Sequence, residues 1–214
     1  RDLVRSRGLG DVYKRQSLCH IDLPGGFPMD HLRAFVDRLS GRFDNSEQLA
    51  ALQRQGIADF PYAEHVNTAC NDKILGLPAD FSGLFLVEES YYTLAGKTNS
   101  SSHLFLFTEE GDKIKLTSYE IPEGYNKASF SYQALRAVAY SSLKESEKFT
   151  PALYTQKDGV WEGGSVSMFS PVLKFTLFEH FSDEMLEVSE TMELNGKRTF
   201  GYDIPILYKR KPGA

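Results

Sequence analysis

Hydrophobic positions change their spacing once along this chain, from the period of a helix to the period of a strand. Within residues 30–39, apolar side chains recur at intervals of three and four, at Leu32, Phe35, Val36 and Leu39. This stripe predicts a helix that lies on a core and ends at Gly41. Asn45, followed by Gln48 three positions on, resembles a helix cap and predicts a second helix through about Gln55.

After Pro78 the spacing becomes two, in segments dense in Phe, Tyr, Val, Leu and Thr. Turn pairs such as Asp158-Gly159 and Asn195-Gly196 separate these segments, as expected between strands. A helical face at Tyr132–Leu143 interrupts them once. The predicted strands cover residues 83–93, 103–108, 113–121, 149–155, 160–168, 172–181, 184–194 and 198–209. Eight strands joined by hairpins predict an antiparallel meander that closes as a barrel or a strongly curled sheet.

The last hairpin allows the strand register to be argued. A two-residue turn at Asn195-Gly196 would place Phe200 on the side of polar residues, whereas a three-residue loop with a bulge places Phe200 with Met192. We prefer the bulged loop, because it keeps Leu186, Val188, Met192 and Phe200 on one face. Glu190 then lies on that apolar face.

Two carboxylates share strand faces with apolar side chains. Glu89 has the parity of Phe85, Val87 and Tyr91, and Glu190 has the parity of Leu186, Val188 and Met192. A carboxylate inside a barrel costs several kcal/mol unless it is paired or hydrogen-bonded. Each one therefore needs a partner.

Two interpretations of these carboxylates stay open. In the first, they belong to an internal polar network or to an outward face of a bulged strand. In the second, Glu89 or Glu190 holds a polar group of a ligand inside the barrel. The residues assigned to that ligand site are Glu88, Tyr91, Tyr92, His103, Tyr119, Trp161, Glu190, Arg198 and Tyr202.

The sequence lacks the common catalytic patterns. It has no glycine-rich phosphate loop, no histidine pair at metal spacing, no nucleophile elbow and no paired-cysteine zinc site, so no metal is predicted. Cys70 with His65 nearby is a weak candidate for a nucleophile, because a lone cysteine in a loop is more often inert. No disulfide, signal peptide or long apolar run is present, which favours a cytoplasmic protein.

The first residues look foreign to the rest of the chain. Residues 1–16 end in Asp-Val-Tyr-Lys-Arg-Gln, which resembles the translated read-through of a sequencing adapter. The alternatives are a disordered basic tail, or an arginine-rich nucleic-acid arm or transit peptide. Two glycines just ahead of Met29 fit a translated ribosome-binding site. We therefore expect residues 1–28 to be leader and residues 29–211 to form one domain.

Removing the foreign segment changes the charge. Residues 1–16 contain five basic and two acidic residues, so the remaining chain has 19 basic and 27 acidic residues and a net charge of −8. Such an acidic chain without a basic stripe is a poor binder of nucleic acid or of anionic membranes. We expect neither partner.

The order of motifs resembles the CpcT/CpeT family of chromophore lyases. Residues 39–48, Leu-Ser-Gly-Arg-Phe-Asp-Asn-Ser-Glu-Gln, are similar to that family's Leu-x-Gly-x-Phe-x-Asn-x-x-Gln opening. Val87-Glu88-Glu89-Ser90 stands where the family tends to have Val-Glu-Gln-Ala. The last segment, from Asn195-Gly196 through Phe200-Gly201-Tyr202 to Arg210, also resembles the family's final hairpin. The resemblance spans roughly residues 32–210.

The resemblance implies a calycin or lipocalin-like β-barrel that attaches a linear tetrapyrrole (bilin) to a cysteine of a client protein. Glu89 would then assist proton transfer as the catalytic acid. Two departures bear on this activity. Ser100-Ser101-Ser102-His103 replaces a segment of the Pro-Tyr-Arg-Gln-Arg type suited to holding propionates, and no cysteine follows Cys70.

Three functions are therefore carried forward. The first is binding, with delivery, of a bilin or similar amphipathic small molecule. The second is a non-enzymatic carrier or sensor of the calycin type. The third is an interaction protein whose barrel is filled by its own side chains. The volume of the cavity separates the third function from the others, and a client cysteine separates the first from the second.

Overall fold

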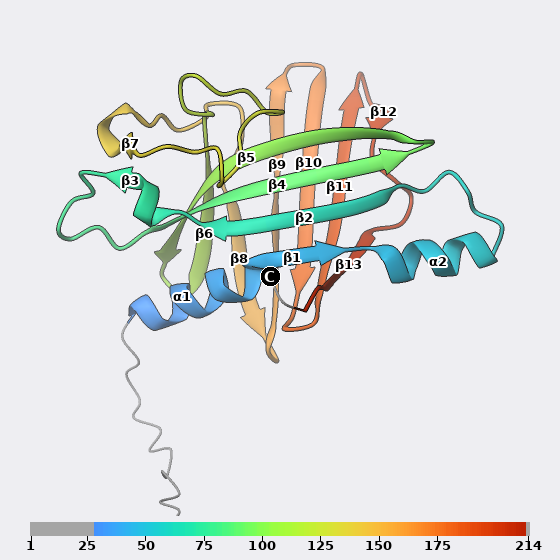
Figure 1. Ribbon diagram of the computed structural model, residues 1–214, viewed down its shortest axis with the longest axis horizontal. Helices are drawn as coiled ribbons and strands as arrows, with labels where there is room; N and C mark the ends of the chain where they lie inside the picture. The colour runs from blue at the N-terminus through green and yellow to red at the C-terminus, as the bar shows by residue number, and fades with distance from the viewer. Residues whose placement is uncertain (1–27, 213–214) are drawn as a thin grey trace, which may run out of the picture.

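A computed structural model describes residues 28–212 and confirms a mainly β fold with two short helices near its start (Figure 1). The predicted leader therefore lies outside the described residues, apart from Pro28. The helices are α1 (Pro28–Leu39) and α2 (Ser46–Arg54), and single 3-10 turns occur at η1 (Asn71–Lys73) and η2 (Tyr140–Ser142). The strands are β1 (Gly41–Asp44), β2 (Tyr62–Ala69), β3 (Ile74–Leu75), β4 (Leu84–Leu94), β5 (Lys97–Glu110), β6 (Lys113–Tyr119), β7 (Val138–Ala139), β8 (Ala152–Lys157), β9 (Val160–Ser170), β10 (Leu173–Phe181), β11 (Met185–Leu194), β12 (Lys197–Phe200) and β13 (Ile206–Arg210).

Ten of these strands close into an antiparallel barrel. The sheet runs β10-β9-β8-β6-β5-β4-β2-β1-β13-β11, and β10 pairs back onto β11. β12 pairs with β11 alone and stays outside the ring. In Figure 1, strands β2, β4 and β5 cross in front of β9, β10 and β11. The predicted meander forms most of the wall, and β1 and β2, which the spacing does not predict, complete it. The strand predicted at residues 198–209 is divided into β12, outside the ring, and β13, within it.

Helix α1 plugs one end of the barrel. All four residues of its apolar stripe are buried, as the spacing predicts. The ring of Phe35 lies 4.8–5.3 Å, between centroids, from the rings of Phe107, Tyr154, Trp161 and Phe181. These four rings come from β5, β8, β9 and β10. One helical side chain therefore contacts four strands of the wall.

A second core lies outside the barrel, on the outer face of β4, β5 and β6. Successive residues of a strand face opposite sides, so Phe85 and Val87 face away from the interior that Leu84 and Leu86 occupy. Residues 120–148 cover this outer face with side chains such as Phe130 and Leu135. The odd-numbered residues of β4 therefore form an apolar face that packs outside the barrel and does not line its interior.

The helix predicted at Tyr132–Leu143 is wrong. The segment instead contains the two-residue strand β7, which pairs in parallel with β3, and the turn η2. Its apolar residues are spaced for a helix, but Leu135 and Leu143 pack on the outer face of the sheet as parts of a covering loop. Tertiary contacts thus override the local pattern.

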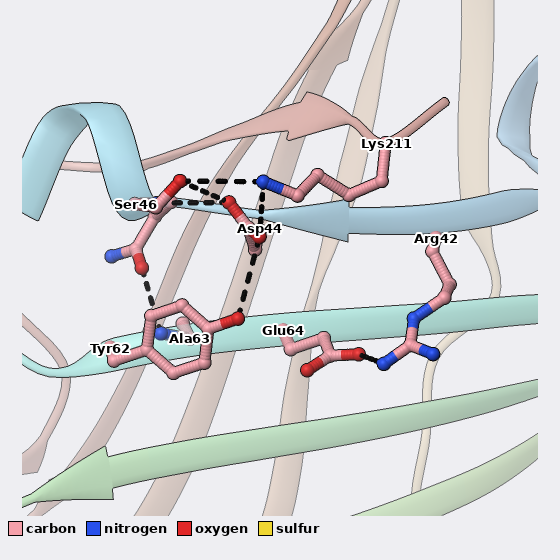
Figure 2. A network of polar contacts seen from close by, with 8 residues as sticks. Arg42, Asp44, Ser46, Tyr62, Ala63, Glu64 and Lys211 are labelled. Carbon is pink, nitrogen blue, oxygen red and sulfur yellow. Dashed lines mark hydrogen bonds and ion pairs between the residues drawn. The ribbon is translucent and has the colours of Figure 1, made fainter. Parts of the chain in front are cut away.

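A polar corner joins β1, β2, α2 and the end of the chain (Figure 2). The Asp44 carboxylate accepts hydrogen bonds from the backbone N–H and the hydroxyl of Ser46 at 3.0 and 2.7 Å, and its second oxygen lies 2.7 Å from Lys211 Nζ. Burial alone raises the pKa of Asp44, but the bonds from Lys211 and Ser46 outweigh it and lower the pKa below its usual value. Arg42 pairs with Glu64 on the neighbouring strand.

The helix cap predicted at Asn45 is wrong in its contacts. Asn45 makes no side-chain cap; it is buried and bonds instead to the carbonyl of Pro61 and the N–H of Ala63. Gln48 likewise reaches across to Pro205 and Leu207, ahead of and within β13. The opening motif thus fastens β1 and α2 to the ends of the barrel wall.

The final hairpin combines both predicted registers. Leu194 pairs with Lys197, so the turn has two residues, Asn195 and Gly196, and both have positive φ. The predicted three-residue loop is therefore wrong. A register shift one residue later nevertheless pairs Met192 with Phe200, as expected for the apolar face. Glu190 lies on that face with Val188.

Candidate functional site

The interior of the barrel is layered from the plug to the open end. Along the inner face of β10 the order is Phe181, Glu179, Leu177 and Phe175, which runs from the α1 plug toward the mouth. β4 and β11 repeat this arrangement, with Glu88 between Leu86 and Ser90 and with Glu190 between Val188 and Met192. Three strands thus place a glutamate in the middle layer of the interior.

Two adjoining cavities lie above the plug. The inner one, about 40 Å³, is bounded by Glu88, Glu179 and Glu190 together. The outer one, about 270 Å³, opens at the mouth. Their walls share His103, Glu190 and two phenylalanines. Larger hollows, about 640 and 490 Å³, lie outside the barrel along residues 120–144, where the charged side chains are exposed.

Each of the three interior glutamates has one hydroxyl donor. The hydroxyl of Tyr154 donates to Glu179, that of Tyr92 donates to Glu190 at 3.3 Å, and that of Ser90 donates to Glu88 at 3.2 Å. A carboxylate has room for about four such bonds. The cluster is therefore under-satisfied within the described part of the chain.

Burial raises the pKa of all three carboxyl groups. It raises the pKa of Glu179 to about 7, although the bond from Tyr154 acts in the opposite direction. Burial together with the charges of Glu179 and Glu190 raises the pKa of Glu88 well above its usual value. Burial also raises the pKa of Glu190, against the effects of Tyr92 and Lys127. A low-dielectric interior disfavours each added charge.

His65 on β2 lies beside the acidic layer. It is 1% exposed, and neither ring nitrogen has a hydrogen-bond partner among the described residues. Its Nδ1 lies 3.7 Å from Glu88 Oε2, too far for a hydrogen bond. Burial lowers the pKa of His65 to about 3, so the ring is neutral. Unpartnered buried groups are rare in proteins and mark places where something else binds.

The mouth of the barrel is aromatic. Phe149, Phe169 and Phe175 form a mutual cluster with centroids 4.9–5.8 Å apart, and all three are only half-buried. Phe200 on β12 and Met192 on β11 continue this rim. Lys127, exposed on the covering loop, is the one lysine or arginine that lines the cavity within residues 28–212. The site thus combines an apolar mouth with an acidic floor.

Four of the predicted ligand-site residues line the cavities. Glu88, Tyr92, His103 and Glu190 all face the interior. Tyr202 borders a small adjoining hollow of about 10 Å³ with Tyr92 and Glu190.

The other predicted residues lie elsewhere. Trp161 packs against α1 in the plug. Tyr119 belongs to the outer core, with its hydroxyl toward Glu145. Arg198 is exposed and pairs with Asp203. These three placements correct the prediction of a common cavity.

Glu89 is also misplaced in that prediction. It follows the cavity residue Glu88 on β4 and so faces the opposite side of the wall. There it accepts hydrogen bonds from the Tyr91 hydroxyl at 2.8 Å and from the Tyr132 N–H at 3.2 Å. Glu89 and Tyr91 thus hold the covering loop onto the barrel and do not line either interior cavity.

Sequence reasoning missed several residues of the site. They are His65, Lys127, Phe149, Tyr154, Phe169, Phe175, Glu179 and Tyr208. Glu179 alternates with Phe175, Leu177 and Phe181, which is the signal that identified Glu190. The opposite face of the same strand carries Phe178, which obscures the alternation.

Other chemistry is less well supported. Cys70 is buried, and burial raises the pKa of its thiol to about 12, which makes it a poor nucleophile. Within residues 28–212, no three His, Cys, Asp or Glu side chains are grouped to hold a metal ion. In the same residues, no helix is both long and apolar enough to cross a membrane.

Comparison with known proteins gives no relative on which to base an assignment. No family model, curated protein or solved structure matches this chain.

Proposed function

We propose that this protein binds an amphipathic small molecule inside the barrel. The apolar part of the ligand lies against Phe149, Phe169 and Phe175, and its polar head reaches the acidic layer. One observation carries this proposal. Three carboxylates from three strands meet at the floor of a cavity whose mouth is a half-exposed aromatic cluster. Pockets with an apolar lining and a few convergent polar groups are typical of ligand sites.

Energetics favour binding over a purely structural role. Three interior carboxylates with few bonds, of which Glu88 and Glu179 are buried and Glu190 is half-buried, destabilise the fold. Apolar residues of similar size would fill the same space at no such cost. Ionisable groups with shifted pKa values cluster at functional sites for this reason. A filled-barrel interaction protein has no use for this acidic layer.

A linear tetrapyrrole is the finer proposal for the ligand, and the motifs at residues 39–48 and 87–90 favour it. Its pyrrole N–H groups are donors suited to Glu88 and Glu190, and Lys127 at the rim suits a propionate. A cavity of about 270 Å³ accommodates only part of such a molecule, so the other rings would lie outside the mouth. Delivery would add the S–H of a client cysteine across a carbon–carbon double bond of the ligand, with Glu190 in place of Glu89 as the nearby acid.

Cavity binding can be tested with N-phenyl-1-naphthylamine, a neutral dye whose fluorescence rises in apolar sites. We expect saturable binding that Phe175→Ala weakens by tenfold or more. Phe178→Ala is the matched control, because Phe178 lies on the same strand but faces outward and is 46% exposed. Equal effects of the two substitutions, or no binding to a stably folded protein, would contradict the proposal.

The tetrapyrrole proposal needs a second titration. Biliverdin binding, followed by absorbance, should weaken by roughly 10- to 100-fold in Glu190→Gln, the range for a hydrogen bond to a charged group. Glu187→Gln on the outer face of the same strand is the control. Glu89→Gln should leave biliverdin affinity unchanged and lower only the stability of the covering loop. Dye binding without biliverdin binding would contradict the tetrapyrrole proposal, and the remaining proposal would be a carrier of another ligand.

A further inference from the structure

The three interior glutamates converge on a volume that suits a small head group. They come from β4, β10 and β11, and all three border the inner cavity of about 40 Å³. That volume is enough for a group the size of one or two water molecules. The larger outer cavity and the phenylalanine cluster then take the body of the ligand.

His65 provides an independent indication that this floor receives a ligand. Its ring is almost fully buried, both nitrogens lack a partner among the described residues, and Nδ1 faces the Glu88 carboxylate at 3.7 Å. A structural histidine at such a position normally bonds to a backbone or side-chain group. Here the ring leaves both nitrogens without a partner among the described residues, beside the Glu88 carboxylate that lines the inner cavity.

Acidic groups around this floor outnumber the groups that carry a positive charge. Titratable and charged groups face the glutamates from every wall: His65 on β2, Tyr92 on β4, His103 on β5, Lys127 on the covering loop, Tyr154 on β8 and Tyr208 on β13. Burial lowers the pKa of each histidine to about 3, and the tyrosines are neutral. Lys127 lies at the rim. Within the described residues no buried cation balances the acidic layer, and the raised pKa values of its carboxyl groups favour their protonated forms when no ligand is bound.

We propose that the cavity selects a primary ammonium head group on an aromatic or apolar body, and that its binding displaces a proton from the acidic layer. This inference rests on the proposed binding of an amphipathic molecule in this cavity, and it names a ligand class other than the tetrapyrrole for that site. An ammonium group has three N–H donors and no acceptor, which complements three carboxylates from three directions. The exchange balances, since the cation enters as one carboxylic acid releases its proton to solvent.

The proton exchange gives the site a defined pH dependence. The pKa of Glu179 is about 7, so protons compete with the cation at lower pH. For one released proton, affinity increases by up to tenfold per pH unit below about pH 7 and levels off above it. A neutral ligand gains nothing from this exchange. Amines of this kind stay charged throughout the range, as lysine does.

The test compares three probes of one shape on the wild-type chain. Tryptamine carries the ammonium group, 3-ethylindole has the same side chain without a polar group, and indole-3-propionate carries a carboxylate. Isothermal titration at pH 6, 7 and 8, in two buffers with different ionisation enthalpies, gives both affinity and proton release. We expect tryptamine to bind at least tenfold tighter than 3-ethylindole at pH 8, with release of close to one proton at pH 6.

Variants then assign the selectivity to the acidic layer. Glu179→Gln and Glu88→Gln should each reduce the preference for tryptamine over 3-ethylindole, while Glu187→Gln keeps it. Tryptamine that binds no tighter than 3-ethylindole, or more weakly than indole-3-propionate, overturns the inference. Saturable dye binding in that case leaves the proposed function intact. A folded protein that binds neither dye nor indoles refutes both.

Discussion

Phe35 is the residue on which the closed end of the barrel depends. Its side chain is fully buried and contacts four rings from four strands. Phe35→Ala removes this contact and leaves a cavity, so we expect the free energy of unfolding to fall by about 3–5 kcal/mol. Denaturant unfolding measures the change, with Asp37→Ala on the exposed side of the helix as control. A loss below about 1 kcal/mol would mean that α1 does not plug the barrel.

Individual residues also show how far the site could be predicted. Glu190 was placed correctly because its neighbours on one face are apolar and those on the other are polar. Glu89 has an equally apolar face, but that face belongs to the second core under residues 120–148. Alternation shows that one face of a strand is buried. It does not show whether that face points into the barrel or toward the covering loop. That information comes from the covering loop, whose packing has no regular period.

Among the elements, β9 has two glycines at which an added Cβ atom would clash with the backbone of a neighbouring strand. A Cβ atom built on Gly164 would lie 2.1 Å from the carbonyl oxygen of Leu177 on β10, which cannot move without breaking the ladder. Gly164→Ala should therefore lower stability by roughly 1–3 kcal/mol or more, as overpacking does. Val166→Thr, on an exposed position of the same strand, is the control and should stay within about 0.5 kcal/mol. Thermal or denaturant unfolding distinguishes the two, and equal stabilities would contradict the close approach.

Elements with strong periods were predictable, and short or irregular ones were not. The two helices and the strands from β4 to β11, apart from the two-residue β7, follow clear apolar spacing. β1 has only four residues, too few to establish a period, and the strand predicted at residues 198–209 is divided into β12 and β13. β2 alternates in burial but carries polar side chains such as His65 and Asn67 on its buried face, so its pattern does not appear as hydrophobic alternation.

At the scale of the whole molecule, stability should depend on pH in an unusual direction. The pKa of Glu179 rises from 4.5 to about 7 on folding, so the folded state binds more protons and stability falls as pH rises through 7. Glu88, whose pKa is also raised by burial and by the charges of Glu179 and Glu190, acts in the same direction. His65 and His103 act oppositely, since their lowered pKa values make stability rise with pH, but only up to about 6.5.

Between pH 6.5 and 8.5 the glutamates therefore dominate. We expect the ligand-free protein to lose stability with a slope of at most about 1.4 kcal/mol per pH unit for each carboxylate that ionises. Glu179→Gln should flatten the slope, and Glu187→Gln should not. Urea unfolding at pH 6.5, 7.5 and 8.5 measures it. Stability that rises over this window would show that the acidic layer is ionised and well paired in the folded state.

The position of β13 has a consequence for how the chain is made. This strand lies between β1 and β11, and its Arg210 bonds to Ser40, 170 positions earlier. The ring therefore cannot close until residue 210 has left the ribosome. At ordinary rates of synthesis, on the order of 10 to 30 s pass between the emergence of β1 and the emergence of β13. Throughout that time β1 lacks this neighbour and presents an open edge to other nascent chains. Yield in the cell should accordingly depend on chaperones that shield this edge more than on the stability of the finished barrel.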